Sequence, residues 1–283
     1  MTHIHGGDTE SYLREYGRKP LDFSANVSPL GLPEGVKKAV CKALEQAEAY
    51  PDPLCRNLCE AIGEKEDRPP AEVICGNGAA DLIFRLIPAV KPKKALLPAP
   101  TFAEYEQALE LFSCEIEYFY LKEENGFSLT DEILTAINGE TDILFLCQPN
   151  NPTGALCEKP LLLEILKRCR ETNTVLVMDE CFTDFLDEPS RFSLSDKLSE
   201  YENLFILKAF TKFYAMAGLR LGYGLCANEN LLKKVRSAGQ PWAVSSLAQA
   251  GGIAALKEKE YEIRLKELLK KEKAYLSKGL SDA

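Results

Sequence analysis

The chain has 283 residues and is 46% hydrophobic, which allows a sizeable core in one large domain or two ordinary ones. Its 34 basic and 43 acidic residues give a formal net charge of −9, which argues against nucleic acid or an anionic membrane surface as the main partner. The first residues lack the basic and apolar segments of a signal peptide, and no later apolar run is long enough to span a bilayer, so we expect a cytoplasmic protein.

The order of segments along the chain predicts an α/β fold. Residues 1–35 are rich in Gly, Pro, Asn and Ser and predict an irregular arm, which a helix at 35–46 follows. Short apolar runs then alternate with amphipathic stretches that predict helices. These runs predict strands at 72–75, 95–97, 116–121, 142–147, 175–178 and 204–207.

From residue 229 onward the pattern is helical, and it ends in a charged amphipathic helix at 258–278. Near-continuous apolar strands separated by helical crossovers indicate a mainly parallel sheet that is covered on both faces. The functional site of such a sheet lies at the carboxyl ends of its strands.

The cysteines predict neither a disulfide framework nor a metal site. Ten of them are scattered singly, several inside apolar runs and none in a Cys-x-x-Cys pair, which is typical of buried, reduced thiols. Cys55 and Cys59 are four residues apart without a matching second pair, which indicates one helix face rather than metal ligands. We therefore expect no metal.

Two predicted strands are followed by turns that could hold part of a ligand. Cys75-Gly-Asn-Gly-Ala-Ala-Asp81 opens an apolar helix at 82–87, and its glycines allow backbone N–H groups to approach an anion at the helix N-terminus. Its spacing matches neither the Walker loop nor the dinucleotide fingerprint, so a plain turn is the alternative. Pro98-Ala-Pro-Thr-Phe-Ala-Glu-Tyr105 follows the next strand, where Phe102 could stack on a heteroaromatic ring or pack in the core.

Two further strands end in polar residues that suit a cofactor. Cys147-Gln-Pro-Asn-Asn-Pro-Thr-Gly154 follows an apolar strand, and its adjacent asparagines offer amide donors for a phenolate oxygen or a carboxylate, with a turn as the alternative. Asp179 ends the strand at 175–178, and a buried carboxylate there needs a partner. A protonated pyridine nitrogen would supply that partner and make the ring an electron sink.

The segment from Lys208 to Gly224 places two basic residues among small and apolar ones. An amine held among apolar groups can attack a carbonyl and form a Schiff base, which suits Lys212. Arg220 could return to the same site and bind a phosphate with its planar guanidinium. The pair points to pyridoxal phosphate, and two surface cations near a helix end are the alternative.

In their order and separation, Asn151-Pro-Thr-Gly, Asp179-Glu and Lys212 with Arg220 resemble the fold-type-I pyridoxal-phosphate enzymes of the aspartate aminotransferase superfamily. The resemblance implies pyridoxal 5′-phosphate as the cofactor and Lys212 as the Schiff-base lysine. It also implies a homodimer in which Tyr50 reaches the neighbouring subunit's cofactor phosphate. The other implied cofactor contacts are Asp179 to the pyridine nitrogen, Asn151 to the ring 3-oxygen, Phe102 stacked on the ring, and Gly78, Ala79, Thr211 and Arg220 to the phosphate.

Further segments are similar to the threonine-phosphate decarboxylases of cobalamin biosynthesis, and this similarity covers nearly the whole chain. They are His5-Gly-Gly-Asp, Leu21-Asp-Phe-Ser-Ala-Asn-Val-Ser-Pro-Leu-Gly31, Gly76-Asn-Gly, Phe102-Ala-Glu-Tyr, Thr211-Lys-Phe-Tyr-Ala and Gln240-Pro-Trp. The similarity implies that His5, Gly6, Asn26 and Asn151 contact a small phosphorylated amino acid, with the N-terminal arm folded over the site as a lid.

The implied reaction is decarboxylation of L-threonine O-3-phosphate to (R)-1-aminopropan-2-yl phosphate. The same residues could carry out transamination, as in histidinol-phosphate aminotransferases, and their spacing does not separate the two outcomes. Three positions depart from the superfamily pattern. Ala209 replaces a serine or threonine that binds the cofactor phosphate, and Ala80 lacks a polar side chain often found in the phosphate turn. Phe182 replaces a tyrosine common in aminotransferases; the decarboxylases tend to have phenylalanine there.

The resemblance also divides the chain. Residues 1–45 are the arm and first helix, 46–240 the large cofactor-binding domain, and 241–283 helices that lead to a small C-terminal domain. In the family that domain supplies arginines for the substrate, and we expect it to be missing here. The expected result is retained cofactor binding with impaired substrate binding, and an inactive cofactor-binding or dimerisation module is the alternative.

Overall fold

The computed structural model describes residues 6–282, and their strands form one seven-stranded sheet in the order β1-β7-β6-β5-β4-β2-β3. Every strand except β7 runs in the same direction, and β7 lies antiparallel between β1 and β6. All six predicted strands are confirmed, with ends that shift by at most two residues. The bounds are β1 (Val73–Gly76), β2 (Lys94–Ala99), β3 (Glu115–Tyr120), β4 (Ile143–Cys147), β5 (Val175–Asp179), β6 (Leu204–Ala209) and β7 (Gly222–Leu225).

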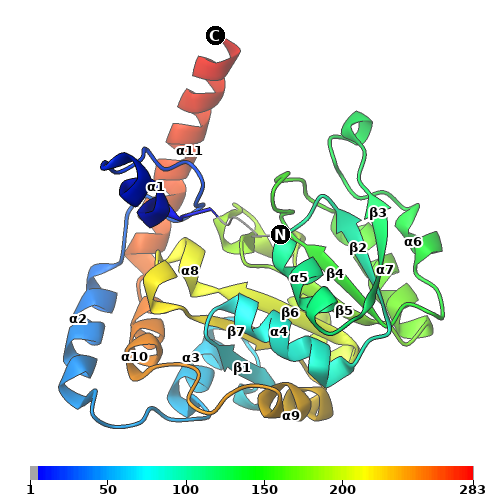
Figure 1. Ribbon diagram of the computed structural model, residues 1–283, viewed down its shortest axis with the longest axis horizontal. Helices are drawn as coiled ribbons and strands as arrows, with labels where there is room; N and C mark the ends of the chain where they lie inside the picture. The colour runs from blue at the N-terminus through cyan, green and yellow to red at the C-terminus, as the bar shows by residue number, and fades with distance from the viewer. Residues whose placement is uncertain (1–5, 283) are drawn as a thin grey trace.

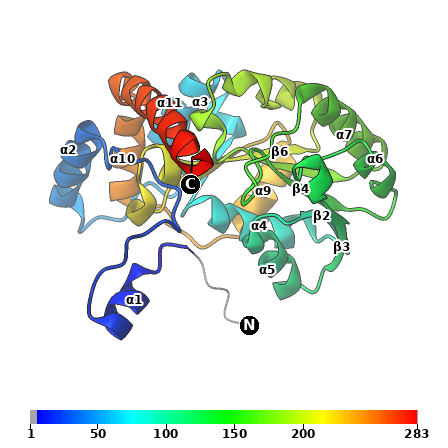
Figure 2. The same ribbon diagram turned by 90° about the horizontal axis from the view of Figure 1, so that it is seen from above.

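Helices cover both faces of this sheet, as the α/β prediction requires (Figure 1, Figure 2). Alternate residues of β4 show why its sequence is continuously apolar, since successive side chains of a strand point to opposite faces. Ile143 and Phe145 belong to one hydrophobic cluster, and Leu144 and Leu146 to the other. The helices of the first cluster are α4 (Ala79–Val90), α5 (Ala103–Leu111) and α9 (Glu229–Ser237), and those of the second include α3 (Arg56–Glu66) and α7 (Lys159–Glu171).

The N-terminal arm contains a helix, α1 (Thr9–Tyr16), so the prediction of an irregular segment over residues 1–35 is wrong in this part. The side chain of Asp8 accepts the N–H of Ser11 at 3.0 Å, and Gly17 ends the helix with a φ of 68°. These are ordinary helix caps, and none of the helix residues is buried. The helix is therefore defined by its caps and not by packing into the core.

The remaining helices follow the prediction more closely. α2 (Glu34–Ala43) continues into a short 3₁₀ turn and packs against α10 (Ser246–Ala255). α11 (Lys259–Ser281) extends away from the sheet (Figure 1) and confirms the predicted helix at 258–278. α6 (Ile133–Ala136) and α8 (Phe210–Phe213) are short. Among the helices of residues 6–282, none combines the length and apolar character needed to cross a membrane.

The strand that the sequence did not predict is β7. Its sequence, Gly222-Tyr-Gly-Leu225, contains two glycines and therefore no apolar run. A Cβ on Gly224 would lie 2.4 Å from Cζ of Phe205 on β6, so the aromatic ring requires glycine beside it. Because β7 is antiparallel, it begins at the edge of the sheet where the parallel strands end, and it brings the preceding Arg220 to that edge.

Candidate active site

The carboxyl ends of the parallel strands bring several polar turns together at one edge of the sheet. β1, β4, β5 and β6 end there, and β7 begins there. Hydrogen bonds connect the neighbouring ends of β4 and β5. The N–H of Gln148 donates to the carbonyl of Asp179 at 2.8 Å, and the hydroxyl of Thr183 donates to the carbonyl of Gln148 at 2.7 Å. The loops after these strands are therefore fixed relative to each other.

Asp179, the last residue of β5, is 4% exposed. The hydroxyl of Tyr105 donates to its Oδ2 at 2.6 Å, and the N–H of Cys181 donates to its Oδ1 at 3.0 Å. Burial, and then the charge of Asp179, raises the pKa of Tyr105 well above its usual range, so the phenol keeps the proton it donates. Within residues 6–282 no cationic side chain pairs with Asp179. The carboxylate can therefore receive a cationic group of a ligand.

The turn before α4 and the start of β7 form a cradle for an anion. Gly78 is the N-cap of α4, with a φ of 84° and no side-chain cap. A Cβ on Gly78 would lie 2.6 Å from Nη2 of Arg220, and a Cβ on Gly222 would lie 2.3 Å from the backbone N of Ala79. Only glycine permits this close approach. The N–H of Gly78 donates to the carbonyl of Gly76 at 2.8 Å, so the free donors are the first N–H groups of α4 beginning at Ala79.

Arg220 has an uncommon backbone conformation for a residue with a side chain, with φ 57° and ψ 68°. It follows the 3₁₀ turn Ala217–Leu219, and this conformation turns the chain from α8 into β7. Its exposed guanidinium donates to the carbonyl of Ala217 at 3.3 Å and lies beside Gly78. Thr211 is buried in α8, at the same edge of the sheet. The edge thus gathers a guanidinium, a hydroxyl and free backbone N–H groups, which together suit a phosphate.

Lys212 lies in α8, directly beyond the end of β6. Its Nζ is 5.7 Å from the centroid of the Phe182 ring, and no carboxylate of the described residues 6–282 pairs with it. The carbonyl of Lys212 accepts the N–H of Ser28 at 3.0 Å, and the hydroxyl of Tyr261 donates to Oγ of Ser28 at 2.6 Å. The N-terminal arm and α11 are thus both anchored beside a lysine whose amine is free to react.

A cleft of about 620 Å³ opens beside these residues. Asn151 and Phe182 line it from the loops after β4 and β5, Asn26 lines it from the N-terminal arm, and α11 forms a further wall. The structure therefore brings together Asn26 and Asn151, two of the predicted substrate residues, and places Phe182 between the cleft and Lys212.

The other predicted site residues are more scattered. Phe102 is the N-cap of α5, and its ring lies edge-on to Tyr105 with 5.5 Å between the centroids. Tyr50 is 80% exposed and stacks on Trp242 at 4.6 Å. Gly6 packs against Ser24 within the arm. Neither Tyr50 nor Gly6 lines the cleft, and His5 lies outside the described residues.

The model of the family described as aminotransferase class I and II matches residues 18–283. The chain belongs to this family. It is 39% identical over 261 residues to the threonine-phosphate decarboxylase of Salmonella typhimurium, covering 91% of this chain and 71% of that protein. It is 30% identical over 284 residues to a histidinol-phosphate aminotransferase of Caldicellulosiruptor saccharolyticus, covering 99% and 78%. The solved histidinol-phosphate aminotransferase of Clostridium acetobutylicum matches with a TM-score of 0.86 at 28% identity, covering 92% and 76%.

Aminotransferases of class I and II use pyridoxal 5′-phosphate, which confirms the predicted cofactor and the fold type. The residues of this chain fit that group. Among residues 6–282, Asp179 is a buried carboxylate that pairs with no cation, the glycines at 78 and 222 let Arg220 and β7 approach the start of α4 closely, and the amine of Lys212 pairs with no carboxylate. Ala209 and Ala80 have no polar side-chain atom, so the polar groups at this place are Thr211, Arg220 and the backbone N–H groups at the start of α4.

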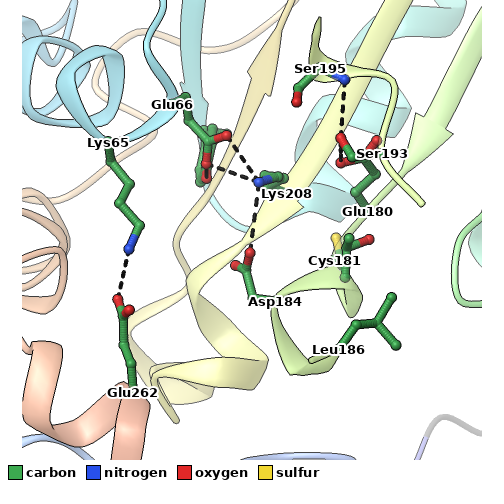
Figure 3. Close-up of polar contacts among 12 residues, drawn as sticks. Lys65, Glu66, Glu180, Cys181, Asp184, Leu186, Ser193, Ser195, Lys208 and Glu262 are labelled. Atoms are coloured by element: carbon green, nitrogen blue, oxygen red, sulfur yellow. Dashed lines mark hydrogen bonds and ion pairs between the residues drawn. The ribbon is translucent and has the colours of Figure 1, made fainter. Parts of the chain in front are cut away.

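An ionic cluster surrounds the buried Lys208, next to the loop that follows β5 (Figure 3). Nζ of Lys208 on β6 is 3.0 Å from both carboxylate oxygens of Glu66 and 3.7 Å from Asp184. Burial alone would lower the pKa of Lys208, but the charges of Asp184, Glu66 and Glu180 outweigh it and raise that pKa. Burial raises the pKa of Glu180 to about 7, although Lys208 and the donors Ser193 and Leu194 oppose the shift.

Sequence reasoning assigned no role to Tyr105 or to this cluster. Tyr105 lies three residues after Phe102, and the two rings are in edge contact with 5.5 Å between their centroids. For Lys208 and Glu180, the sequence pattern shows only a charged residue at or next to the end of an otherwise apolar strand. A charge in such a position must find a partner, but the pattern does not say which.

Proposed function

We propose that this protein is a pyridoxal-phosphate-dependent carboxy-lyase that converts L-threonine O-3-phosphate to (R)-1-aminopropan-2-yl phosphate, a reaction of cobalamin biosynthesis in the cytoplasm. The observation that carries this choice is the 39% identity to a relative named threonine-phosphate decarboxylase. Relatives named histidinol-phosphate aminotransferase are 30% to 32% identical. Phe182 beside Lys212 also supports the proposal, since the decarboxylases tend to have phenylalanine at this position.

When bound, the cofactor supplies an electron sink for the electron pair left at the substrate Cα. Asp179, oriented by Tyr105 and the N–H of Cys181, keeps the ring nitrogen protonated. Arg220, Thr211 and the start of α4 would hold the cofactor phosphate, Phe102 would cover the ring, and Asn151 would donate to the ring oxygen. These contacts fix the ring, so that the orientation of the substrate determines which bond at Cα breaks.

We assign to Lys212 the transfer of the proton to or from the substrate Cα. When the bond between Cα and the carboxylate breaks, CO2 leaves and Nζ of Lys212 delivers a proton to Cα. If the Cα proton is removed instead, the same amine accepts it, and the outcome is transamination. The ring of Phe182, 5.7 Å from Nζ, helps to exclude water from this amine.

A histidinol-phosphate-type aminotransferase is the second candidate. The observation that favours it is the structural match with a TM-score of 0.86 at 28% identity. Both candidates use the same cofactor residues and a phosphorylated substrate, and they differ in the bond that breaks at Cα. An inactive cofactor-binding module is the third candidate.

The test is to incubate the protein, loaded with pyridoxal 5′-phosphate, with O-phospho-L-threonine. We expect release of CO2 and formation of a phosphorylated amino alcohol. Transfer of the amine to 2-oxoglutarate without CO2 would reverse the order of the two enzymatic candidates. If the protein binds the cofactor but neither O-phospho-L-threonine nor histidinol phosphate changes its absorbance spectrum, the inactive module would be favoured.

The role of Lys212 is tested separately by borohydride reduction of the loaded protein and peptide mapping. We expect the pyridoxyl label on Lys212 and not on Lys208, whose amine is occupied by Glu66. A label on any other lysine, or none, would contradict the proposed site.

We also propose a homodimer in which Tyr50 reaches the neighbouring subunit's cofactor phosphate. Its 80% exposed ring is stacked on Trp242, which positions the phenol at the surface. Tyr50→Phe should leave the molar mass in solution unchanged and weaken cofactor binding by roughly tenfold, as expected for the loss of a hydrogen bond to a charged group. Unchanged cofactor affinity in a protein that is dimeric would rule out this contact.

A further inference from the structure

One wall of the cleft beside Asn151 is a row of lysines on α11. Lys266, Lys270 and Lys273 line the cleft, and their spacing places them on one face of the helix. α11 also carries four glutamates, none of which lines the cleft: Glu260, Glu262, Glu267 and Glu272. The face of α11 that lines the cleft therefore carries lysines and no glutamate.

The cleft is positive although the chain as a whole is acidic. Its lining contains three lysines and one acidic residue, Asp187, in a chain with a formal net charge of −9. In the part of the chain that the structure describes, none of the three lysines pairs with a carboxylate. The local charge favours an anionic ligand.

Lys266 is the best positioned of the three. It is half-buried, and its Nζ donates to the carbonyl of Leu186 at 3.0 Å. That bond holds the ammonium group against the loop after β5. An ammonium group has three donors, so two remain for a ligand. Lys270 and Lys273 are exposed further along the same face.

We infer that this lysine row binds the phosphate group of the substrate, an inference that rests on the proposed function. A phosphate carries close to two negative charges and three acceptor oxygens, and several ammonium groups can share it. The substrate carboxylate is a poorer fit, because strong ion pairs in the ground state would oppose its loss as CO2. Asn26 and Asn151 line the same cleft and offer neutral amide donors for the rest of the substrate.

This site is separate from the cradle assigned to the cofactor phosphate. Gly78, Ala79 and Arg220 form that cradle, and none of them lines the cleft. The chain therefore has two anion sites on different elements, one at the start of α4 and one on α11. With the cofactor bound, the first site is filled and the second remains open to a phosphorylated molecule.

The experiment measures inorganic phosphate binding to the cofactor-loaded protein by calorimetry. In the double variant Lys266→Gln/Lys270→Gln we expect the Kd for phosphate to rise by about tenfold, since hydrogen bonds to charged groups contribute more than neutral ones but exposed charges are screened. Lys271→Gln is the matched control. Lys271 lies on the same helix and is exposed, but it does not line the cleft, so its replacement should leave the Kd unchanged.

An unchanged phosphate Kd in the double variant, with a melting temperature equal to that of the parent protein, would overturn the inference. The result is distinguishable from a failure of the proposed function. Normal CO2 release from O-phospho-L-threonine with a lysine-independent phosphate Kd rejects the lysine row alone. No CO2 release with a lysine-dependent Kd rejects the decarboxylase proposal and leaves the anion site in place.

Discussion

Replacing Tyr105 by phenylalanine tests whether Asp179 is held ready for a cationic partner. The change removes one hydroxyl, whose bond to Oδ2 of Asp179 is 2.6 Å long. The ring contacts remain, since the stacking on Phe145 at 4.9 Å and the edge contact with Phe102 at 5.5 Å do not involve the hydroxyl. Asp179 keeps its contacts with Cys181, which are the backbone N–H and the thiol.

The expected cost follows from burial. Tyr105 and Asp179 are 0% and 4% exposed, so water cannot replace the lost donor. A hydrogen bond to a buried charged group contributes about 1.5–3 kcal/mol, and we expect the free energy of unfolding of the cofactor-free protein to fall by that amount. At about 2–4 °C per kcal/mol for a chain of this size, the melting temperature should fall by roughly 3–12 °C.

The assay is thermal unfolding with and without pyridoxal 5′-phosphate. A carboxylate that has lost a donor gains more from a cationic ring nitrogen than one with all its donors, so the cofactor should raise the melting temperature more in Tyr105→Phe than in the parent protein. Tyr118→Phe is the control, because Tyr118 also bonds a carboxylate, that of Glu106, but at the surface. Its effect should stay within about 0.5 kcal/mol.

Two results would refute this reasoning. An equal loss in Tyr105→Phe and Tyr118→Phe would mean that the buried bond contributes no more than an exposed one. An equal stabilisation by the cofactor in the Tyr105→Phe and parent proteins would mean that the ring nitrogen does not reach Asp179.

Three further replacements test the ionic cluster and the cradle. The two in the cluster are measured by thermal or urea unfolding, and the one in the cradle is measured by cofactor binding. Since the folded-state pKa of Glu180, about 7, lies above its ordinary value of 4.5, its contribution to stability is full below about pH 4.5, falls by roughly 3 kcal/mol as the pH rises to about 7, and is lost above that. Glu180→Gln should remove that slope; an unchanged slope would contradict it. Lys208→Met should cost about 3–5 kcal/mol by leaving buried carboxylates without a cation, and a loss below about 1 kcal/mol would exclude this role. Gly222→Ala should abolish cofactor binding, because its Cβ would lie 2.3 Å from the N of Ala79; normal binding would contradict the cradle.

The strands that could be predicted are those whose faces are both buried, because each such strand is a continuous apolar run. β4 and β6 are buried over almost their whole length. β7 is buried as well, but its two glycines exist because the Phe205 ring and the backbone of Ala79 approach it closely. Those contacts are tertiary, so no local pattern could reveal them. α1 escaped prediction for the opposite reason, since it buries no side chain.

Part of the candidate site could be predicted from position alone. Asp179 and Lys212 stand just at or after apolar strands, and parallel strands end at one edge of a sheet. The partners of these residues could not be predicted in the same way. Glu66 lies 142 residues before Lys208 in the sequence, on a helix whose pattern resembles any amphipathic helix. Only the fold brings the two together.

Two adjacent carboxylates, Asp179 at the end of β5 and Glu180 directly after it, show how that placement determines chemistry. Asp179 pairs in register with Leu207 of β6, and successive side chains of a strand point to opposite faces. Asp179 therefore shares its face with Leu207 and Tyr105, whereas Glu180 shares the other face with Lys208. Because the only nearby buried lysine of residues 6–282 is on the Glu180 side, Asp179 is left with neutral donors. A lysine one position earlier in β6 would neutralise Asp179 and remove the reason for a cationic ring nitrogen to bind there.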